Sequence, residues 1–308
     1  MLVLTRAQVR ELLDLDDLLV ALERAFVELS AGRTSVPPRI AASTERGFLA
    51  AMPGYADGIL ETKLVSVFPE NREVPSHQAT ISLFDEADGR PLALMDGTEI
   101  TAARTGASSA VSIRALARED ARVLAVLGAG VQARSHIAAA TRVREFDEVR
   151  IASRNADHAR ELARDLGGVA VGSFEEAVRK ADVVCACTDA AEPVLSVDWL
   201  DPGSHVTSVG ASREGPELDR ATVTAGLLAV ESRVAFEPYP AGAHELQGLD
   251  PQSAVELGEL LSGTREGRTS AEQITVYKSM GHAVEDAAAA GLVYRRARER
   301  DIGTEVEL

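Results

Sequence analysis

The sequence has little cysteine, no long apolar run and no excess of glycine or proline. It holds two cysteines, 24 glycines and 12 prolines in 308 residues, which excludes a disulfide scaffold and a collagen-like or low-complexity chain. No apolar run approaches the ~20 residues of a membrane-spanning helix. The first residues also lack the basic and apolar regions of a secretion signal. We therefore expect a cytoplasmic protein with no membrane partner.

The two cysteines predict structural thiols. Cys185 and Cys187 alternate within VVCACT, which places both on one face of a strand. That is a poor geometry for a disulfide between them. Burial in a reducing compartment is favoured over a redox pair.

Positive charge is also scarce. Lys and Arg number 32 against 48 Asp and Glu, a net charge of −16, which repels phosphate backbones and anionic bilayers. Nucleic acid is therefore not an expected partner. If the ligand is an anion, the basic residues that lie in apolar or small-residue surroundings mark where it binds.

The first part of the chain divides into helical and strand-rich regions. Apolar residues recur at helical spacing over 5–31, which predicts a helical hairpin or a long broken helix. Short apolar runs separated by turn residues over 40–95 are typical of a mainly antiparallel sheet. Residues 98–116 are rich in Ala, Ser and Thr and predict a closely packed helix with Thr98 as its cap.

From about residue 120 the pattern changes to apolar strands that alternate with helices. This alternation indicates a parallel sheet covered on both faces. The segment ITVYKS predicts a further strand, and the Ala-rich stretch after it predicts a long helix that packs back on the first domain. The final EVEL is expected to fray. Length alone allows two domains at ~150 residues each.

A glycine turn follows the apolar strand RVLAVL and opens a helix, as in the G-x-G-x-x-G/A dinucleotide fingerprint. Gly128 permits the tight turn, Gly130 lets the backbone approach a pyrophosphate, and Ala133 keeps the helix close to the strand. A glycine turn without a ligand is the alternative. The cofactor-contacting residues predicted here are Gly128, Ala129, Gly130, Val131 and Gln132.

The end of the next strand suggests which dinucleotide binds. It reads Ser153-Arg154-Asn155, without the carboxylate that would hold the ribose hydroxyls of NAD. A guanidinium beside small polar side chains suits a 2′-phosphate. NADP(H) is therefore preferred, with NAD(H) possible, and a solvated loop arginine is the alternative. No metal site is predicted.

Three cations stand where little water is expected. Arg39 follows two prolines, Lys63 lies in the apolar strand TKLVSVF, and Arg104 stands among Ala, Thr and Gly. Each alone reads as a side chain that reaches solvent or pairs with a carboxylate. Together they favour an anion site.

Segments along nearly the whole chain carry a family resemblance. They are TKLVSVF, VPSHQATISLF, ALMDGTEITAARTGASSA, GAGVQARSH, EVRIASRN, VGASR, ELGELLSG and TVYKSMGHAVEDAAAA. In this order and spacing the sequence resembles the ornithine cyclodeaminase and mu-crystallin family, and its motifs match the mu-crystallin branch in particular.

The resemblance implies an α/β protein in which a Rossmann NAD(P)-binding domain is inserted into an α+β domain. Residues 1–115 plus 278–308 would form the substrate-binding and dimerisation domain, and residues 116–277 the Rossmann domain, with catalysis in the interdomain cleft. It also implies a homodimer, which the exposed edges of the first sheet favour as well.

The resemblance further assigns site residues. Arg39, Lys63 and Arg104 match positions around the substrate carboxylate near the nicotinamide, with Arg104 also toward the cofactor and Lys63 as proton donor or acceptor. The positions that match cofactor contacts are Ser76, His77, Thr188 and Ser279. For His77, binding the nucleotide is favoured over acting as a general acid. Glu256 is either an acidic site residue or part of a solvated helix face.

Two departures bear on the reaction. Cyclodeaminases of this family carry a glutamate and an aspartate where this sequence has Ala50 and Ser212, and neither side chain replaces a carboxylate as a base. We therefore expect an NADPH-dependent reductase of a cyclic ketimine carboxylate, a small anionic imino-acid substrate, with Ser212 hydrogen-bonding the substrate nitrogen. The alternatives are an alanine-type amino-acid dehydrogenase, an ornithine cyclodeaminase and an NADPH-dependent small-ligand binding protein.

Overall fold

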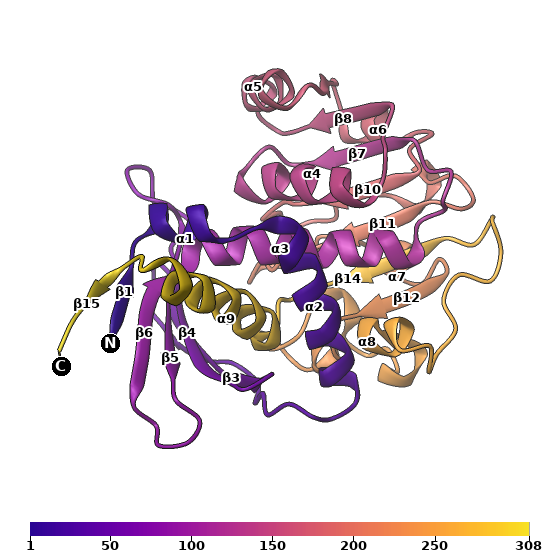
Figure 1. Ribbon diagram of the computed structural model, residues 1–308. Helices are drawn as coiled ribbons and strands as arrows, with labels where there is room; N and C mark the ends of the chain where they lie inside the picture. Colours follow the sequence, from indigo (N-terminus) through magenta and orange to yellow (C-terminus); the bar gives the residue numbers. More distant parts are fainter. Residues whose placement is uncertain (308) are drawn as a thin grey trace. The chain divides into compact units, whose positions relative to one another are not determined.

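The computed structural model describes residues 1–307 and separates into two units (Figure 1). The first unit joins Met1–Arg104 to the C-terminal segment that begins at His282, so it is built from both ends of the chain. The second is the continuous segment Thr105–Gly281. The boundary falls within helix α3 (Gly97–Leu116).

The first unit has helices on one seven-stranded sheet. Its helices are α1 (Arg6–Leu12), α2 (Leu15–Ser30) and α9 (Ala283–Arg300). Its strands are β1 (Leu2–Leu4), β2 (Ile40–Ser43), β3 (Phe48–Ala56), β4 (Ile59–Val67), β5 (His77–Phe84), β6 (Pro91–Asp96) and β15 (Thr304–Glu305). The broken helix is confirmed: Asp14 accepts a hydrogen bond from the Asp17 N–H at 3.0 Å and starts α2.

The predicted antiparallel sheet is confirmed for β2 to β6, which pair in sequence order, and β1 adds in parallel to β6. The expectation of a frayed C-terminus was wrong. Strand β15 pairs with β1, and Met1 and Val306 exchange two backbone hydrogen bonds of 2.9 Å. The chain ends therefore lie side by side (Figure 1).

Helix α3 is confirmed, but its predicted cap was wrong. Asp96 caps the helix by accepting from the Glu99 N–H at 2.8 Å, whereas the Thr98 hydroxyl accepts from the Ala79 N–H at 3.0 Å. A carboxylate is a strong N-cap acceptor, and it stands one residue before the helix. The Thr98 hydroxyl instead ties the helix start to β5.

The second unit is an all-parallel eight-stranded sheet, as expected, in the order β13-β12-β14-β11-β10-β7-β8-β9. Its strands are β7 (Val123–Leu127), β8 (Glu148–Ala152), β9 (Val169–Ala170), β10 (Val183–Ala186), β11 (His205–Ser208), β12 (Leu227–Val230), β13 (Val255–Glu256) and β14 (Thr275–Lys278). Its helices are α4 (Val131–Val143), α5 (Ala156–Leu166), α6 (Phe174–Val178), α7 (Arg220–Val223) and α8 (Leu257–Leu261).

The small residues of α3 and the two cysteines behave as the sequence predicts. A Cβ added to Gly106 would lie 2.5 Å from the Ser135 hydroxyl of α4, so the two helices approach closely there. Cys185 and Cys187 are buried free thiols. Burial raises the pKa of Cys185 to about 12, so this thiol is unreactive.

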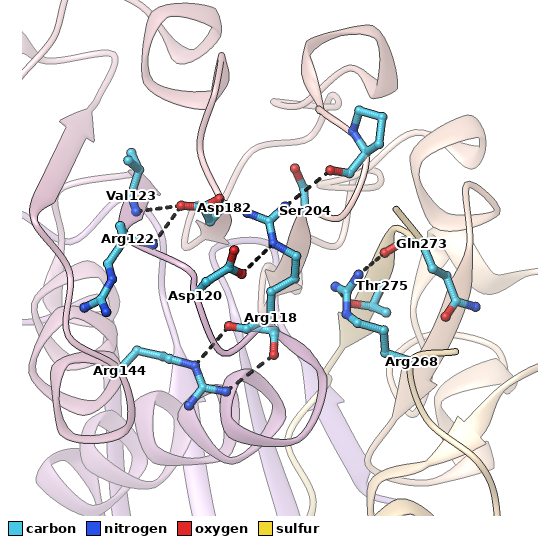
Figure 2. A network of polar contacts seen from close by, with 12 residues as sticks. Arg118, Asp120, Arg122, Val123, Arg144, Asp182, Ser204, Arg268, Gln273 and Thr275 are labelled. Carbon is cyan, nitrogen blue, oxygen red and sulfur yellow. Dashed lines mark hydrogen bonds and ion pairs between the residues drawn. The ribbon is translucent and has the colours of Figure 1, made fainter. Parts of the chain in front are cut away.

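The amino end of the parallel sheet is closed by polar contacts (Figure 2). One carboxylate oxygen of Asp182 accepts from the backbone N–H groups of Arg122 and Val123 at 2.7 and 2.9 Å. The other pairs with Arg118 at 2.5 Å. Asp182 directly precedes β10, Arg122 directly precedes β7, and Val123 begins β7. This one carboxylate therefore fixes the start of both strands.

Two further arginines satisfy carbonyls at the end of α3. Arg144 donates to the carbonyls of Ala117 and Arg118 at 3.4 and 3.2 Å; Figure 2 shows its contact with Arg118. Arg268 donates to the Leu116 carbonyl at 2.7 Å. Terminal helix carbonyls lack intrahelical partners, and a cation there also suits the helix dipole. Structural contacts occupy this end, and ligands of such sheets bind at the opposite, carboxyl end.

None of the described helices is long and apolar enough to cross a membrane.

Candidate functional site

The first unit buries a cluster of charges centred on Lys63. The residue lies on the inner face of β4, opposite Met52 of β3 and Ile81 of β5, and its side chain is 2% exposed. Its ammonium contacts Asp286 of α9 at 2.6 Å. Burial lowers the pKa of Lys63 to about 8, and Asp286 opposes this effect. The side chain is therefore mostly protonated at neutral pH.

Asp286 and Glu285 hold the second cation of the cluster. Arg104 contacts Asp286 at 3.3 Å through Nε and Glu285 at 3.1 Å through Nη1. Glu285 also accepts from the His282 N–H at 2.7 Å, which fixes it in the first turn of α9. Burial alone would raise the pKa of Asp286, but Lys63 and Arg104 hold it below its usual value. Lys63, Arg104, Glu285 and Asp286 are called the charge cluster below.

Other predicted residues lie around this cluster. The charge of Arg39 acts on both Lys63 and Asp286, so the three cations are brought together. His77 begins β5. Desolvation by the surrounding protein lowers its pKa to about 4, and the charges of Lys63, Arg104 and Arg39 add to this effect. Its imidazole is therefore neutral at neutral pH. Ser76 precedes it and is exposed, with its carbonyl accepting from the Phe68 N–H at 2.8 Å.

The sequence reasoning missed the acidic half of the site. Glu285 and Asp286 stand at the start of an Ala-rich helix, and Glu61 stands two residues before Lys63 in an apolar strand. All three are fully or almost fully buried. The signal was available, because buried carboxylates in such surroundings need cationic partners, and the predicted cations had no assigned counter-charges.

In the second unit the predicted glycine turn lies between β7 and α4. Gly128 has a φ of +112°, and an added Cβ would meet the carbonyl oxygen of Cys187 at 2.6 Å. Gly130 is the N-cap of α4, and a Cβ there would meet nothing within 4 Å. Because Gly130 has no side chain to accept from the first turn of α4, those N–H groups are available to an anion. The turn comprises Gly128, Ala129, Gly130, Val131 and Gln132.

The loop after β8 holds a loosely paired arginine. Ser153 accepts from the Asn155 N–H at 3.3 Å, and Asn155 caps α5 by accepting from the Asp157 N–H at 2.9 Å. Arg154 pairs with Asp189 at 3.3 Å, and both side chains are largely exposed. Such a pair contributes little stability, so a phosphate can replace the carboxylate as the partner of Arg154.

A buried carboxylate organises the loops after β10 and β11. Glu217 accepts from the N–H and hydroxyl of Thr188 at 2.6 and 2.7 Å. Its other oxygen accepts from the Ser208 hydroxyl and the Gly210 N–H, both at 2.7 Å. Four donors satisfy this carboxylate, and Thr188 is thereby held at the carboxyl end of the sheet. The sequence reasoning did not single out Glu217.

Lys278 fixes the same loop from β14. It is fully buried, donates to the Gly210 carbonyl at 2.6 Å and to the Ser208 hydroxyl at 3.1 Å, and pairs with Glu245 at 2.9 Å. The loop that starts at Gly210 carries Ser212. Lys278 was also missed, because its partners lie in loops that follow other strands.

The remaining predicted residues lie at the same edge of the sheet. Ser212 is half-buried and accepts from the Glu214 N–H at 3.1 Å, and Ser279 follows β14, is buried and accepts from the Gly281 N–H at 3.1 Å. Carboxyl ends of neighbouring parallel strands meet at one edge, where ligands of such sheets bind.

Glu256 is neither a free acid nor a solvated residue of a helix face. It is the N-cap of α8 and pairs with Arg233 at 3.4 Å.

The second unit has the Rossmann fold of NAD(P)-binding domains, with the glycine turn at the carboxyl end of strand β7. The chain belongs to the ornithine cyclodeaminase/mu-crystallin family, whose model matches residues 1–301. The resemblance noted in the sequence is thereby confirmed, as is the α/β fold class.

Three known proteins illustrate the similarity. The ketimine reductase mu-crystallin of Mus musculus is 42% identical over 293 residues, which cover 90% of this chain and 91% of that protein. The Delta(1)-pyrroline-2-carboxylate reductase of Thermococcus litoralis, solved with NADH and L-proline, has a TM-score of 0.93 and 36% identity and covers 99% of this chain and 100% of that one. An archaeal alanine dehydrogenase dimer with bound NAD has a TM-score of 0.90 and 29% identity, covering 100% of this chain and 99% of that one.

Proposed function

We propose that this protein is an NAD(P)-dependent oxidoreductase that reduces the C=N bond of a cyclic ketimine carboxylate to a cyclic imino acid. The observation that carries the proposal is the buried charge cluster of the first unit, in which Lys63 and Arg104 both contact Asp286. The second unit of the same chain has a Rossmann fold. The substrate would be of the pyrroline-2-carboxylate or piperideine-2-carboxylate type. Relatives named for ketimine and pyrroline-2-carboxylate reduction support this choice.

The first unit would bind and protonate the substrate. Arg39 and Arg104 would orient its carboxylate, because a guanidinium matches that group in shape and charge. The Lys63 ammonium, held by Asp286 at 2.6 Å, would give its proton to the imine nitrogen and make the ring an electrophilic iminium. Ser212 would hydrogen-bond the same nitrogen, and solvent would return the proton to Lys63.

The second unit fits a dinucleotide. The first N–H groups of α4 suit the pyrophosphate, and the open space beside Gly130 allows its approach. His77, Ser76, Thr188 and Ser279 would supply further polar contacts. When bound, the nicotinamide supplies the hydride for the imine carbon. We propose NADPH as the preferred form because the residues directly after β8 are Ser153, Arg154 and Asn155, with no carboxylate among them.

A spectrophotometric assay tests the proposal. The purified protein is mixed with NADPH or NADH and with each of the two cyclic ketimines, and cofactor oxidation is followed. Oxidation with a ketimine and none with pyruvate plus ammonia is the expected result. NADPH binding without any oxidation would instead identify a ligand-binding protein and reject the enzymatic proposal.

An amino-acid dehydrogenase acting on a 2-oxo acid and ammonia is the second candidate, favoured by the similarity to alanine dehydrogenase. It needs the same geometry on an acyclic imine, and the pyruvate arm of the assay detects it. Cyclodeamination is less well supported. Ala50 lies on the inner face of β3 and is buried, so the position where cyclodeaminases carry a glutamate provides no acid.

Replacement of Arg154 by alanine is expected to raise the KM for NADPH about tenfold to a hundredfold and to leave the KM for NADH unchanged. The guanidinium would contact only the 2′-phosphate, and a charge-assisted hydrogen bond of ~1.5 to 3 kcal/mol accounts for this range. Arg160→Ala is the matched control, since Arg160 is an exposed arginine of α5 paired with Asp157. Equal effects on both cofactors would contradict the assignment.

We also propose a homodimer formed through the outer face of the first unit's sheet. Side chains alternate between the two faces of each strand, which places Leu49 of β3 and Leu64 of β4 on this outer face, where they are 49% and 41% exposed. Leu60 and Ile40 lie on the same face. The alanine dehydrogenase neighbour is a dimer. Light scattering is expected to give twice the chain mass of 32.6 kDa. Leu64→Glu should give the monomer and Val20→Glu, an exposed site on α2, should not; a dimeric L64E protein would reject this face.

A further inference from the structure

Glu61 is a buried carboxyl group beside the charge cluster. It lies on β4 two residues before Lys63, on the same inner face, and is 2% exposed. Neither of its carboxyl oxygens accepts a hydrogen bond within residues 1–307. Its cross-strand neighbour on β3 is Gly54, where an added Cβ would lie 3.3 Å from one of these oxygens. The absence of a side chain at Gly54 leaves room for the carboxyl group.

Burying an ionised carboxylate without a hydrogen bond is very costly, so such groups take up a proton. Burial and the negative charge of Asp286 both raise the pKa of Glu61 well above its usual value, and Lys63 opposes them only in part. A neutral Glu61 is therefore the form that this surrounding stabilises.

The charge of the whole site depends on this proton. Three cations, Lys63, Arg104 and Arg39, face two carboxylates, Glu285 and Asp286. Ionisation of Glu61 would lower the net positive charge of this cluster by one, and neutral Glu61 leaves it unchanged. A carboxylate ligand is therefore attracted more strongly when Glu61 is neutral.

We propose that Glu61 is a positioning residue that sets the net charge of the anion site and thereby limits the pH range over which a carboxylate substrate binds. The inference deepens the proposed function and rests on it. As pH rises, ionisation of Glu61 adds a negative charge next to the bound carboxylate. Affinity for the substrate then falls while the hydride-transfer geometry is unchanged.

The groups that could produce the same pH effect come from every neighbouring element. On β4 there is Lys63; α9 contributes Glu285 and Asp286, and His282 precedes it. The others are Arg104 of α3, Arg39 and His77. Both histidines have lowered pKa values and are already neutral at alkaline pH. Lys63 is thus the competing titration, and it is present in wild type and Glu61 variants alike.

The test compares KM for a cyclic ketimine in wild type and Glu61→Gln at about pH 6.5 and about pH 9.5, on either side of the pKa of Lys63. The two proteins are expected to have the same KM while Glu61 keeps its proton, because both side chains are then neutral. Once Glu61 ionises as the pH rises, the wild-type KM should exceed that of the variant by about threefold to thirtyfold, the effect of one nearby charge.

Three controls make the result decisive. Glu61→Leu also stays neutral at all pH values and should reproduce the glutamine variant, while Glu45→Gln, at an exposed position before β3, should follow the wild type. The infrared spectrum of the wild type at neutral pH should contain a protonated-carboxyl band that Glu61→Gln lacks. A KM ratio that is the same at both pH values, or absence of this band, would overturn the inference. If the proposed function itself is wrong, the wild type will reduce no ketimine at either pH, and the two failures can therefore be distinguished.

Discussion

Lys63→Met is expected to lower kcat/KM for ketimine reduction by about a hundredfold to ten-thousandfold, the usual contribution of a positioned proton donor. The ammonium lies 2.6 Å from Asp286 inside the protein, so solvent cannot easily replace it. Steady-state assays with NADPH measure the loss. Lys180→Met, at an exposed position after α6, is the matched control and should be fully active.

The pH dependence gives this prediction a second readout. The folded-state pKa of Lys63 is about 8, so the proton-donating form is present below this value and declines as pH rises through it. We expect wild-type kcat/KM to fall above about pH 8, and the residual activity of Lys63→Met to lack this fall. A variant with wild-type activity, or with the same alkaline fall, would show that Lys63 is not the proton donor.

Substitution of the two glycines of the β7–α4 turn is expected to separate folding from cofactor binding. Gly128→Ala forces a side chain into a φ of +112° and against the Cys187 carbonyl, so it should lower the free energy of unfolding by at least about 1–3 kcal/mol and abolish cofactor binding. Gly130→Ala meets no protein atom within 4 Å, so it should keep its stability and lose affinity, because the methyl group occupies the approach of the pyrophosphate.

Urea unfolding and fluorescence titration with NADPH measure the two effects separately. Gly167→Ala is the control for backbone strain alone, since that glycine has a φ of +73° with no neighbour within 4 Å. Its cofactor affinity should be unchanged. Full affinity in Gly130→Ala would mean that the pyrophosphate does not lie on this turn.

The architecture could be predicted where local pattern and fold agree. Apolar alternation predicted the antiparallel strands, and the alternation of strands with helices predicted the parallel sheet. The errors lie at chain ends and caps. Asp96 rather than Thr98 caps α3 because the Thr98 hydroxyl is used by the distant Ala79 N–H, and β15 pairs with β1, a strand at the other end of the chain.

The candidate site was predictable for its cations and its glycine turn, and not for its carboxylates. Lys63 and Arg104 stand out as charges in apolar surroundings, but only the register of β4 and the packing of α9 show that Asp286 lies between them. Glu217 and Lys278 were invisible for the same reason, since their partners belong to loops after other strands. Tertiary pairing determined these roles, and no local pattern encodes it.

The discontinuity of the first unit has a consequence for biosynthesis. Strands β2 to β6 are translated before the second unit, whereas α9, which packs on β3 and β4 and supplies Glu285 and Asp286, is translated after it. The continuous segment Thr105–Gly281 can fold as a unit before then. Lys63 and Glu61 therefore stay hydrated on an uncovered sheet until α9 has been synthesised, and their charges are enclosed only after the second unit has been made.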